Sequence, residues 1–464
     1  MNTPFEPISR RTLLQRLGTG FGMLGLAGLL ADQKLLANGP ANPLAPKQPH
    51  FTPRAKRIIH VFMNGGPSQV DTFDPKPELV RYHGRPPGGA HANIRGGTRT
   101  LMASPYCFRN CGQSGLPVSE IFPRIAECAD DLCVIRSMHT NVPNHEPSLL
   151  MMTCGDTQPV RPSMGSWLVY GLGTENQNLP GFITMCPGIP VVGPALWSNS
   201  FLPGIFQGAH INSSNMDPRR VLQNLSNGYL SQAAQREQVD LMRRLNQMHL
   251  EARGGSDNPL EARIQSMEMA FRMQFEAQEV FDLNRETTAT RDLYGRGQFN
   301  DACLVARRLV ERGVRAVQIF TGAGQPWDDH GSIANHRNNA RTVDQPVAAL
   351  LKDLKARGLL EDTLVLWGGE FGRTPTSEGA TGRDHNSSGF TVWLAGGGVK
   401  GGMAYGESDE FGFAAAEKRM HVHDLHATML HLLGIDHERL TYRYSGRDFR
   451  LTDVSGTVAR DIIA

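Results

Sequence analysis

The sequence lacks several features that would assign it to a particular class of protein. Its formal net charge is only +2, from 47 Lys and Arg against 45 Asp and Glu, so no strong field favours nucleic acid or an anionic surface as a partner. No apolar run is long enough to cross a bilayer comfortably, and no repeat has the period of a solenoid. We therefore expect no nucleic-acid partner, and no stable membrane span unless an N-terminal signal stays uncleaved.

Cysteine is also scarce, with seven residues in 464. Cys107, Cys111, Cys128 and Cys133 lie close together in the sequence, but their C-x3-C and C-x4-C spacings fit a zinc ribbon poorly. We predict one or two disulfides among them, formed after export, and the alternative is that they are thiols of the core.

What is present is the composition of a globular, loop-rich protein, with 40% hydrophobic residues, 50 Gly and 29 Pro. Strand and helix patterns alternate along it. "AKRIIHVFMNGGPSQ" is a continuous apolar strand ending in a Gly-rich turn, whereas "NDACLVARRLVERGVRAVQIFTGAG" and "TVDQPVAALLKDLKARGLLEDTLVLWGGE" each contain a helix followed by a strand. Such successive units predict an α/β fold, in which a mostly parallel sheet is flanked by helices on both faces.

The first residues have the layout of an export signal. "SRRTLLQRLGTGFGMLGLAGLLA" places Arg10 and Arg11 ahead of a short apolar run from about Gly18 to Ala31, the pattern of a twin-arginine signal peptide. A short amphipathic helix is the alternative. We expect export by the twin-arginine pathway to the periplasm or the extracellular space. The predicted parts of the chain are a signal peptide, 1–37, a linker, 38–53, and one domain, 54–464, with a helical insertion at about 226–290.

Polar side chains follow several of the predicted strands. Open parallel sheets bind ligands beyond the carboxyl ends of their strands, so acids and histidines at those positions are candidate ligands. They are Asp71 after strand 57–63, Asp328 and His330 after strand 314–320, Glu370, Asp384 and His385 after strand 363–367, and His423 ahead of the last helix. Carboxylates and imidazoles on one rim predict a site for divalent cations, with Zn, Ca, Mn and Mg as candidates.

Five segments together resemble a large, largely uncharacterised family of exported bacterial proteins related to sulfatases and alkaline phosphatases. These are "MNGGPSQVDTFDPKP", "RPSMGSWLVYGLGTENQNLPGF", "GGEFGRTP", "GRDHN" and "DLHATMLHLLGIDHERLTYRYSGRDFRLTDVSG". The resemblance runs from about Arg57 to Ala464. It implies the α/β core that alkaline phosphatases, sulfatases and phosphopentomutases share, and a small-molecule or glycan ester as substrate.

The chain departs from that superfamily at several positions. Asn64 stands where the first strand of the superfamily ends in a metal-binding aspartate, and Asp71 is the nearest substitute. Phe371 stands where a metal-binding histidine is expected. His145 occupies the place of the sulfatase nucleophile, Cys or Ser, and no Arg follows Ser148. The catalytic candidates are therefore His145, Ser148 and a metal-activated water.

Two hypotheses follow. The first is an exported, metal-dependent hydrolase of sulfate or phosphate esters that uses two ions. One ion would have Asp71, Glu370, Asp384 and His385 as ligands, and the other Asp328, His330 and His423. The second hypothesis is a catalytically inactive binding or scaffold protein on the same fold. A metal-free alternative also exists for the loop after the strand 363–367, namely an ion pair between Glu370 and Arg373.

Overall fold

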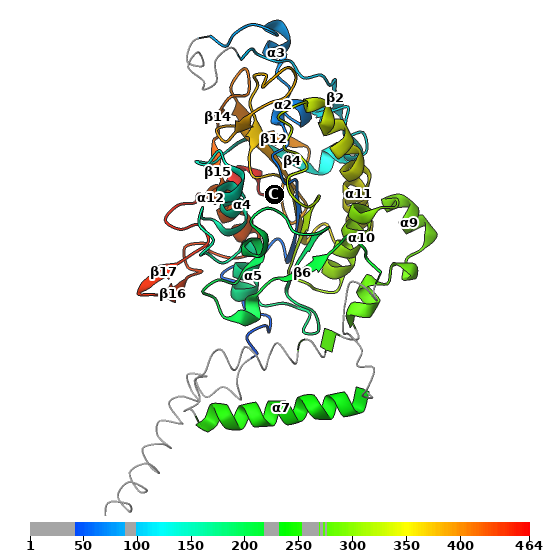
Figure 1. The fold of residues 1–464 in the computed structure, drawn as a ribbon, viewed down its shortest axis with the longest axis vertical. Helices are drawn as coiled ribbons and strands as arrows, with labels where there is room; N and C mark the ends of the chain where they lie inside the picture. Colours follow the sequence, from blue (N-terminus) through cyan, green and yellow to red (C-terminus); the bar gives the residue numbers. More distant parts are fainter. Residues whose placement is uncertain (1–41, 89–98, 218–231, 253–268, 270–271, 274–275) are drawn as a thin grey trace, which may run out of the picture.

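A mixed α/β core with one large sheet makes up most of the computed structural model (Figure 1). The structure describes residues 42–88, 99–217, 232–252, 269, 272–273 and 276–464. The predicted signal peptide, 1–37, lies outside these residues, as does part of the linker and of the helical insertion. The predicted domain boundaries stay predictions.

The large sheet has nine strands. In spatial order they are β12 (Met403–Tyr405), β4 (Leu132–His139), β11 (Phe390–Ala395), β8 (Thr363–Gly368), β1 (Arg57–Phe62), β7 (Ala316–Phe320), β5 (Phe182–Cys186) and β6 (Ala209–Asn212), with β15 (Met420–His421) also paired to β4. Strand β11 is antiparallel to β4 and β8, and all other pairings in this sheet are parallel. The mostly parallel sheet predicted from the sequence is confirmed.

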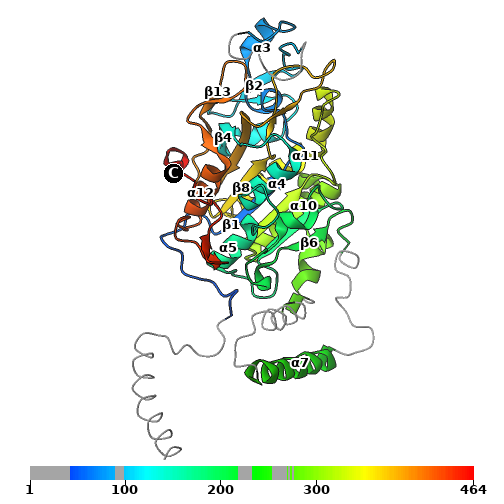
Figure 2. The same cartoon turned by 60° about the vertical axis from the view of Figure 1, so that its left-hand side comes forward.

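Helices cover both faces of the sheet, because alternate residues of its strands point to two separate cores. Ile59 and Val61 of β1 belong to the core that includes α10 (Gln298–Glu311) and α11 (His336–Ala356). Ile58 and Phe62 belong to the core formed with α4 (His145–Cys154), α5 (Met164–Leu172) and α12 (Val422–Leu432). Figure 2 shows β1 and β8 between α12 on the left and α10 and α11 on the right. This arrangement confirms the predicted fold class.

The described residues contain further α-helices and 3-10 helices. They are α2 (Gln69–Thr72), α3 (Pro77–Arg81), η2 (Ile125–Asp131), η3 (Gly193–Trp197), η4 (Gly204–Phe206), α7 (Gln232–Ala252), η5 (Leu283–Arg285), α9 (Thr288–Tyr294), η6 (Ile333–Asn335) and η7 (Arg460–Ile462). Four two-stranded ribbons pair β2 (Phe108–Cys111) with β3 (Leu116–Ser119), β9 (Gly372–Arg373) with β10 (His385–Asn386), β13 (Glu407–Ser408) with β14 (Ala415–Glu417), and β16 (Tyr442–Tyr444) with β17 (Arg447–Phe449). Among the residues described, no helix combines the length and apolarity that a membrane span requires.

The turn after β1 brings two loops of the sheet edge into contact. Gly65 has a φ of +111°, and a Cβ there would lie 2.7 Å from the backbone nitrogens of Trp327 and Asp328. Only glycine accepts that backbone conformation and that approach without strain. The loop after β7, which carries Asp328, is therefore seated directly on the end of β1.

All seven cysteines are free in the structure, so the predicted disulfides are wrong, and the core-thiol alternative holds for Cys128 and Cys133. The physical reason lies in the two cores. Cys128 packs into the core of α10 and α11, whereas Cys133 packs into the core on the opposite face of the sheet. Cys107 is exposed.

Candidate metal centre

Asp328 stands at the centre of a group that we call the histidine cluster, made of His145, Asp328, His330 and His385. Its Oδ1 lies 3.2 Å from the Nε2 atom of His145, 2.9 Å from that of His330 and 3.3 Å from that of His385. One ligand atom from each of the four residues lies within 4.8 Å of the others. His145 begins α4, Asp328 and His330 follow β7, and His385 begins β10. Three separate segments therefore converge on one carboxylate oxygen.

The other nitrogen of each imidazole is held by an oxygen atom. Nδ1 of His145 lies 2.7 Å from Glu370 Oε1, Nδ1 of His385 lies 2.8 Å from the Pro143 carbonyl, and Nδ1 of His330 contacts a Glu378 carboxylate oxygen. Carbonyl and carboxylate oxygens accept hydrogen bonds, so Nδ1 carries the proton in each neutral ring and Nε2 keeps its lone pair. Metal-ligating histidines are fixed in this way by carboxylates and carbonyls behind them.

The inward-facing nitrogens lack partners that would satisfy all of them. His145 Nε2 is buried and makes no hydrogen bond, since its approach to Asp328 Oδ1 is a close ion-pair distance only. The Nε2 atoms of His330 and His385 lie 2.9 Å apart, and two such nitrogens share at most one proton. Lone pairs that face an anionic oxygen repel one another unless protons or a cation lie between them. The donor set therefore fits a bound divalent cation.

The pKa shifts of two members agree with this charge distribution. Burial lowers the pKa of His145, but the carboxylates of Asp328 and Glu370 outweigh it and raise that pKa to about 8. Burial raises the pKa of Asp328, but the neighbouring imidazoles of His145 and His385 and the charge of Arg373 hold it well below its usual range. The raised pKa of His145 reflects the two carboxylates beside it, whereas the lowered pKa of Asp328 reflects the arginine and the imidazoles around it.

Glu370 is fully buried just past β8 and positions His145. Its carboxylate accepts the backbone N–H of Gly65, at 3.0 and 3.2 Å, in addition to its contact with His145. The sequence offered Arg373 as its partner in a metal-free ion pair, but the structure pairs Arg373 with Asp328 Oδ1 at 2.6 Å. Arg373 thus forms its ion pair with Asp328 of the histidine cluster rather than with Glu370.

A second group of possible ligands adjoins the first. His330, Glu378 and Asp384 place ligand atoms within 4.8 Å of one another. Arg99, however, lies 2.6 Å from Asp384 Oδ2 and 3.5 Å from Glu378 Oε1. A guanidinium that already neutralises these acids leaves less reason for a cation there. Sequence reasoning missed Glu378, and its one signal was its place in the same Gly-rich loop as Asp384.

Asp71 and His423, both predicted as ligands, are not brought to the histidine cluster. Asp71 is fully buried, and its two carboxylate oxygens lie 2.7 and 3.2 Å from Nε and Nη2 of Arg383. His423 Nε2 lies 2.8 Å from the Gly155 carbonyl. Both side chains thus have partners within the fold that are unrelated to a metal.

Two further predicted positions have structural contacts. The Oγ of Ser148 donates to the carbonyl of Val142 at 2.7 Å. Asn64, which replaces the aspartate of the superfamily, donates through Nδ2 to the carbonyls of Gly322 and Gly324. An amide can bind those carbonyls, whereas a carboxylate would repel them, so the asparagine suits a role in holding the loop after β7.

Comparison with solved structures gives matches of low identity. The chain is similar to the PsFucS1 sulfatase from Pseudoalteromonas sp., with 12% identity, coverage of 83% of this chain and 69% of the other, and a TM-score of 0.34. The chain is also similar to the lipoteichoic acid synthase LtaP from Listeria monocytogenes, with 9% identity, coverage of 88% of this chain and 78% of the other, and a TM-score of 0.36. A third match is the alkaline phosphatase from the Antarctic bacterium TAB5, with 9% identity, coverage of 75% of this chain and 92% of the other, and a TM-score of 0.26.

No curated protein matches this sequence. The family model described as "Protein of unknown function (DUF1501)" matches residues 55–463, so the chain belongs to that family.

Proposed function

We propose that the protein is an exported, metal-dependent hydrolase of sulfate or phosphate esters. The observation that carries this proposal is the convergence of three imidazole Nε2 atoms on Asp328 Oδ1, each with its Nδ1 held by an oxygen. Groups of ionisable side chains with perturbed pKa values are typical of functional sites, and these nitrogens and the carboxylate are groups that can hold a divalent cation. The resemblance of the sequence to relatives of sulfatases and alkaline phosphatases supports the choice of ester.

The ligands of the ion would be His145, His330, His385 and Asp328. A set rich in imidazole favours Zn over Mn, Mg and Ca, which prefer oxygen ligands. When bound, a divalent cation supplies Lewis-acid stabilisation of an ester oxygen and lowers the pKa of a nearby water. The structure supports one ion at the histidine cluster, rather than the two ions with Asp71 and His423 that the sequence suggested.

The residues around the cluster have distinct tasks. Glu370 and Glu378 orient His145 and His330 and increase their basicity. Arg373, fully buried, keeps Asp328 ionised and in place. These tasks require no substrate contact.

Of the three nucleophiles that the sequence left open, we propose water. The hydroxyl of Ser148 is committed to the Val142 carbonyl, and His145 has its Nδ1 on Glu370 and its Nε2 toward Asp328. His145 is therefore assigned as a metal ligand and Ser148 as a structural residue of α4. Water also fits an ester hydrolase that resembles sulfatases but has neither Cys nor Ser at the position of their nucleophile.

The test is hydrolysis of a panel of sulfate and phosphate mono- and diesters, with Zn, Mn, Mg or Ca added. The wild type should hydrolyse at least one class of ester, and His385→Ala should reduce that rate at least about 100-fold. His249→Ala, which changes an exposed histidine of α7, serves as the matched control and should leave the rate unchanged. A protein that binds metal and sulfated or phosphorylated glycans but hydrolyses no ester would instead support the binding-protein hypothesis.

A further inference from the structure

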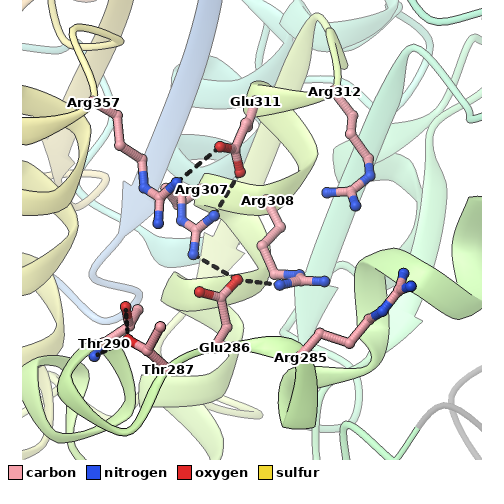
Figure 3. Close-up of a pocket in the computed structure, with 9 residues that line it drawn as sticks. All are labelled: Arg285, Glu286, Thr287, Thr290, Arg307, Arg308, Glu311, Arg312 and Arg357. Carbon is pink, nitrogen blue, oxygen red and sulfur yellow. Dashed lines mark hydrogen bonds and ion pairs between the residues drawn. The ribbon is translucent and has the colours of Figure 1, made fainter.

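A polar cavity lies at the C-terminal ends of α10 and α11 (Figure 3). Its volume is about 580 Å³. It is lined by five arginines, two glutamates and two threonines, namely Arg285, Arg307, Arg308, Arg312, Arg357, Glu286, Glu311, Thr287 and Thr290. We call it the arginine pocket.

Its position follows from the chain path. Helices α10 and α11 each end shortly before the start of the strand that follows, β7 and β8 respectively. The C-terminal ends of these helices, with Arg312 and Arg357, therefore lie near the N-terminal ends of the parallel strands. The histidine cluster lies beyond the carboxyl ends, so the arginine pocket is not an extension of that site.

Two of the arginines are fully committed to the protein. Nε, Nη1 and Nη2 of Arg307 contact Asp353, Glu311 and Glu286 at 2.9, 2.5 and 2.7 Å. Arg308 contacts Glu286 through Nη1 and donates to the backbone carbonyls of Val280 and Glu279. These two side chains form the rigid floor of the pocket.

Two other arginines are held only by one exposed carboxylate. Arg285 Nη1 lies 3.0 Å from Glu279 Oε1, and Arg312 Nη2 lies 3.8 Å from Glu279 Oε2. The side chains of Arg285, Arg312 and Glu279 are 50%, 25% and 53% exposed. In Figure 3 the guanidinium groups of Arg285, Arg308 and Arg312 lie on the same side of the pocket. Within the described residues, this glutamate is the one acid that faces both Arg285 and Arg312.

The charges of the pocket do not balance. Its five arginines face four carboxylates, which are the two lining glutamates together with Asp353 and Glu279. The acid nearest to Arg285 and Arg312 is solvent-exposed, and an exposed ion pair contributes at most about 1 kcal/mol. An anion with more charge and more acceptor oxygens would displace it readily.

We propose that the arginine pocket binds a tetrahedral oxyanion, phosphate or sulfate, between Arg285 and Arg312, with Arg308 behind it. Guanidinium groups match the oxygens of such anions in geometry and in charge. The carboxylate of Glu279 occupies this place when no ligand is bound and competes with it. The site is independent of the proposed hydrolase activity, since no residue of the histidine cluster takes part.

The experiment is calorimetric titration of the full chain with inorganic phosphate and, separately, inorganic sulfate. Ionic strength is held constant with sodium chloride, and EDTA is present so that no metal-held anion contributes. The wild type should show saturable binding. Arg285→Gln and Arg312→Gln should each weaken it about tenfold, and Glu279→Gln should strengthen it about fivefold by removing the competing carboxylate.

Arg443→Gln is the matched control. Arg443 is exposed, pairs with Asp448 and lies in strand β16, which does not line the arginine pocket. It should bind the anions as the wild type does. Binding of one anion alone assigns the site to that anion. Absence of saturable binding in both the wild type and Glu279→Gln, or equal affinity in the wild type and Arg312→Gln, would overturn the proposal.

Discussion

Two regions of this protein contain clusters of carboxylates, and they neutralise them in different ways. In the floor of the arginine pocket, Glu286, Glu311 and Asp353 face the guanidinium groups of Arg307 and Arg308. In the histidine cluster, Asp328 faces three imidazole nitrogens and one arginine. Arginine is always protonated, so its ion pairs neutralise the carboxylates of the first region without a ligand. Imidazole nitrogens can carry either a proton or a lone pair, so the second region can take up protons or a metal cation.

The position of an acid shortly after a strand does not tell whether it is neutralised by arginine or surrounded by imidazoles. Asp71 follows β1 closely in sequence, yet its oxygens are bonded to Arg383, and both side chains are fully buried. Its chemistry is that of the arginine pocket floor. Asp328 also has an arginine partner, Arg373, so what distinguishes it from Asp71 is the group of three imidazoles around it.

The largest expected effect on this comparison comes from Arg307→Ala. It leaves the buried acids Glu286 and Asp353 without their central cation, which should lower the free energy of unfolding by about 3–5 kcal/mol. Urea denaturation measures this. Arg312→Ala is the control, since its only pair is exposed and distant, and it should change stability by less than about 1 kcal/mol. Equal losses in the two variants would remove the distinction between the floor and the rim of the pocket.

Metal removal should have the next largest effect. A ligand present at 100 times its Kd stabilises the folded state by about 2.7 kcal/mol, so chelation should lower the Tm of metal-loaded wild type. His385→Ala should already lack this stabilisation and should not respond to the chelator. An identical Tm with and without chelator in the wild type would show that the histidine cluster, like the floor of the arginine pocket, needs no bound ion for stability.

A smaller effect is expected behind the ligands. Glu378→Gln keeps an acceptor for His330 Nδ1 but loses the charge, and metal affinity should fall about tenfold. Competition with a fluorescent chelator measures the affinity. Glu361→Gln, at an exposed position, should leave it unchanged, and an unchanged affinity in Glu378→Gln would show that this carboxylate does not tune His330.

Ser148→Ala should have the smallest effect. Loss of the hydrogen bond to Val142 should destabilise the protein by about 1 kcal/mol, while the rate of ester hydrolysis stays within about twofold of wild type. Steady-state assays alongside thermal melts check both. Complete loss of hydrolysis with metal retained would favour a covalent serine mechanism.

The fold was predictable from the sequence because the strands are apolar along their whole length. The run that became β1 contributes Ile58 to one core and Ile59 to the other, so the sequence itself implies burial on both faces. Disulfide pairing was not predictable, because Cys128 and Cys133, near in sequence, lie on opposite faces of the sheet.

The candidate site was predictable only in part. The sequence identified Asp328, His330 and His385 as candidates, but it could not show which acids already have a cationic partner. Asp71 and Arg383 are 312 residues apart, and pairings of that range follow from the tertiary fold. The role of His145 also depended on the fold, since only the position of its ring between Glu370 and Asp328 indicates a ligand rather than a nucleophile.

The most direct test of the account is the metal content of the purified protein by elemental analysis. The wild type should contain about one Zn per chain, and His145→Ala and His385→Ala should each lose most of it while staying folded. His423→Ala, which changes a histidine bonded to the Gly155 carbonyl, should retain the ion. Two results would contradict the assignment of the histidine cluster as a metal centre. One is a wild type that contains no metal after incubation with the ion, and the other is one bound ion per chain in both His145→Ala and His385→Ala.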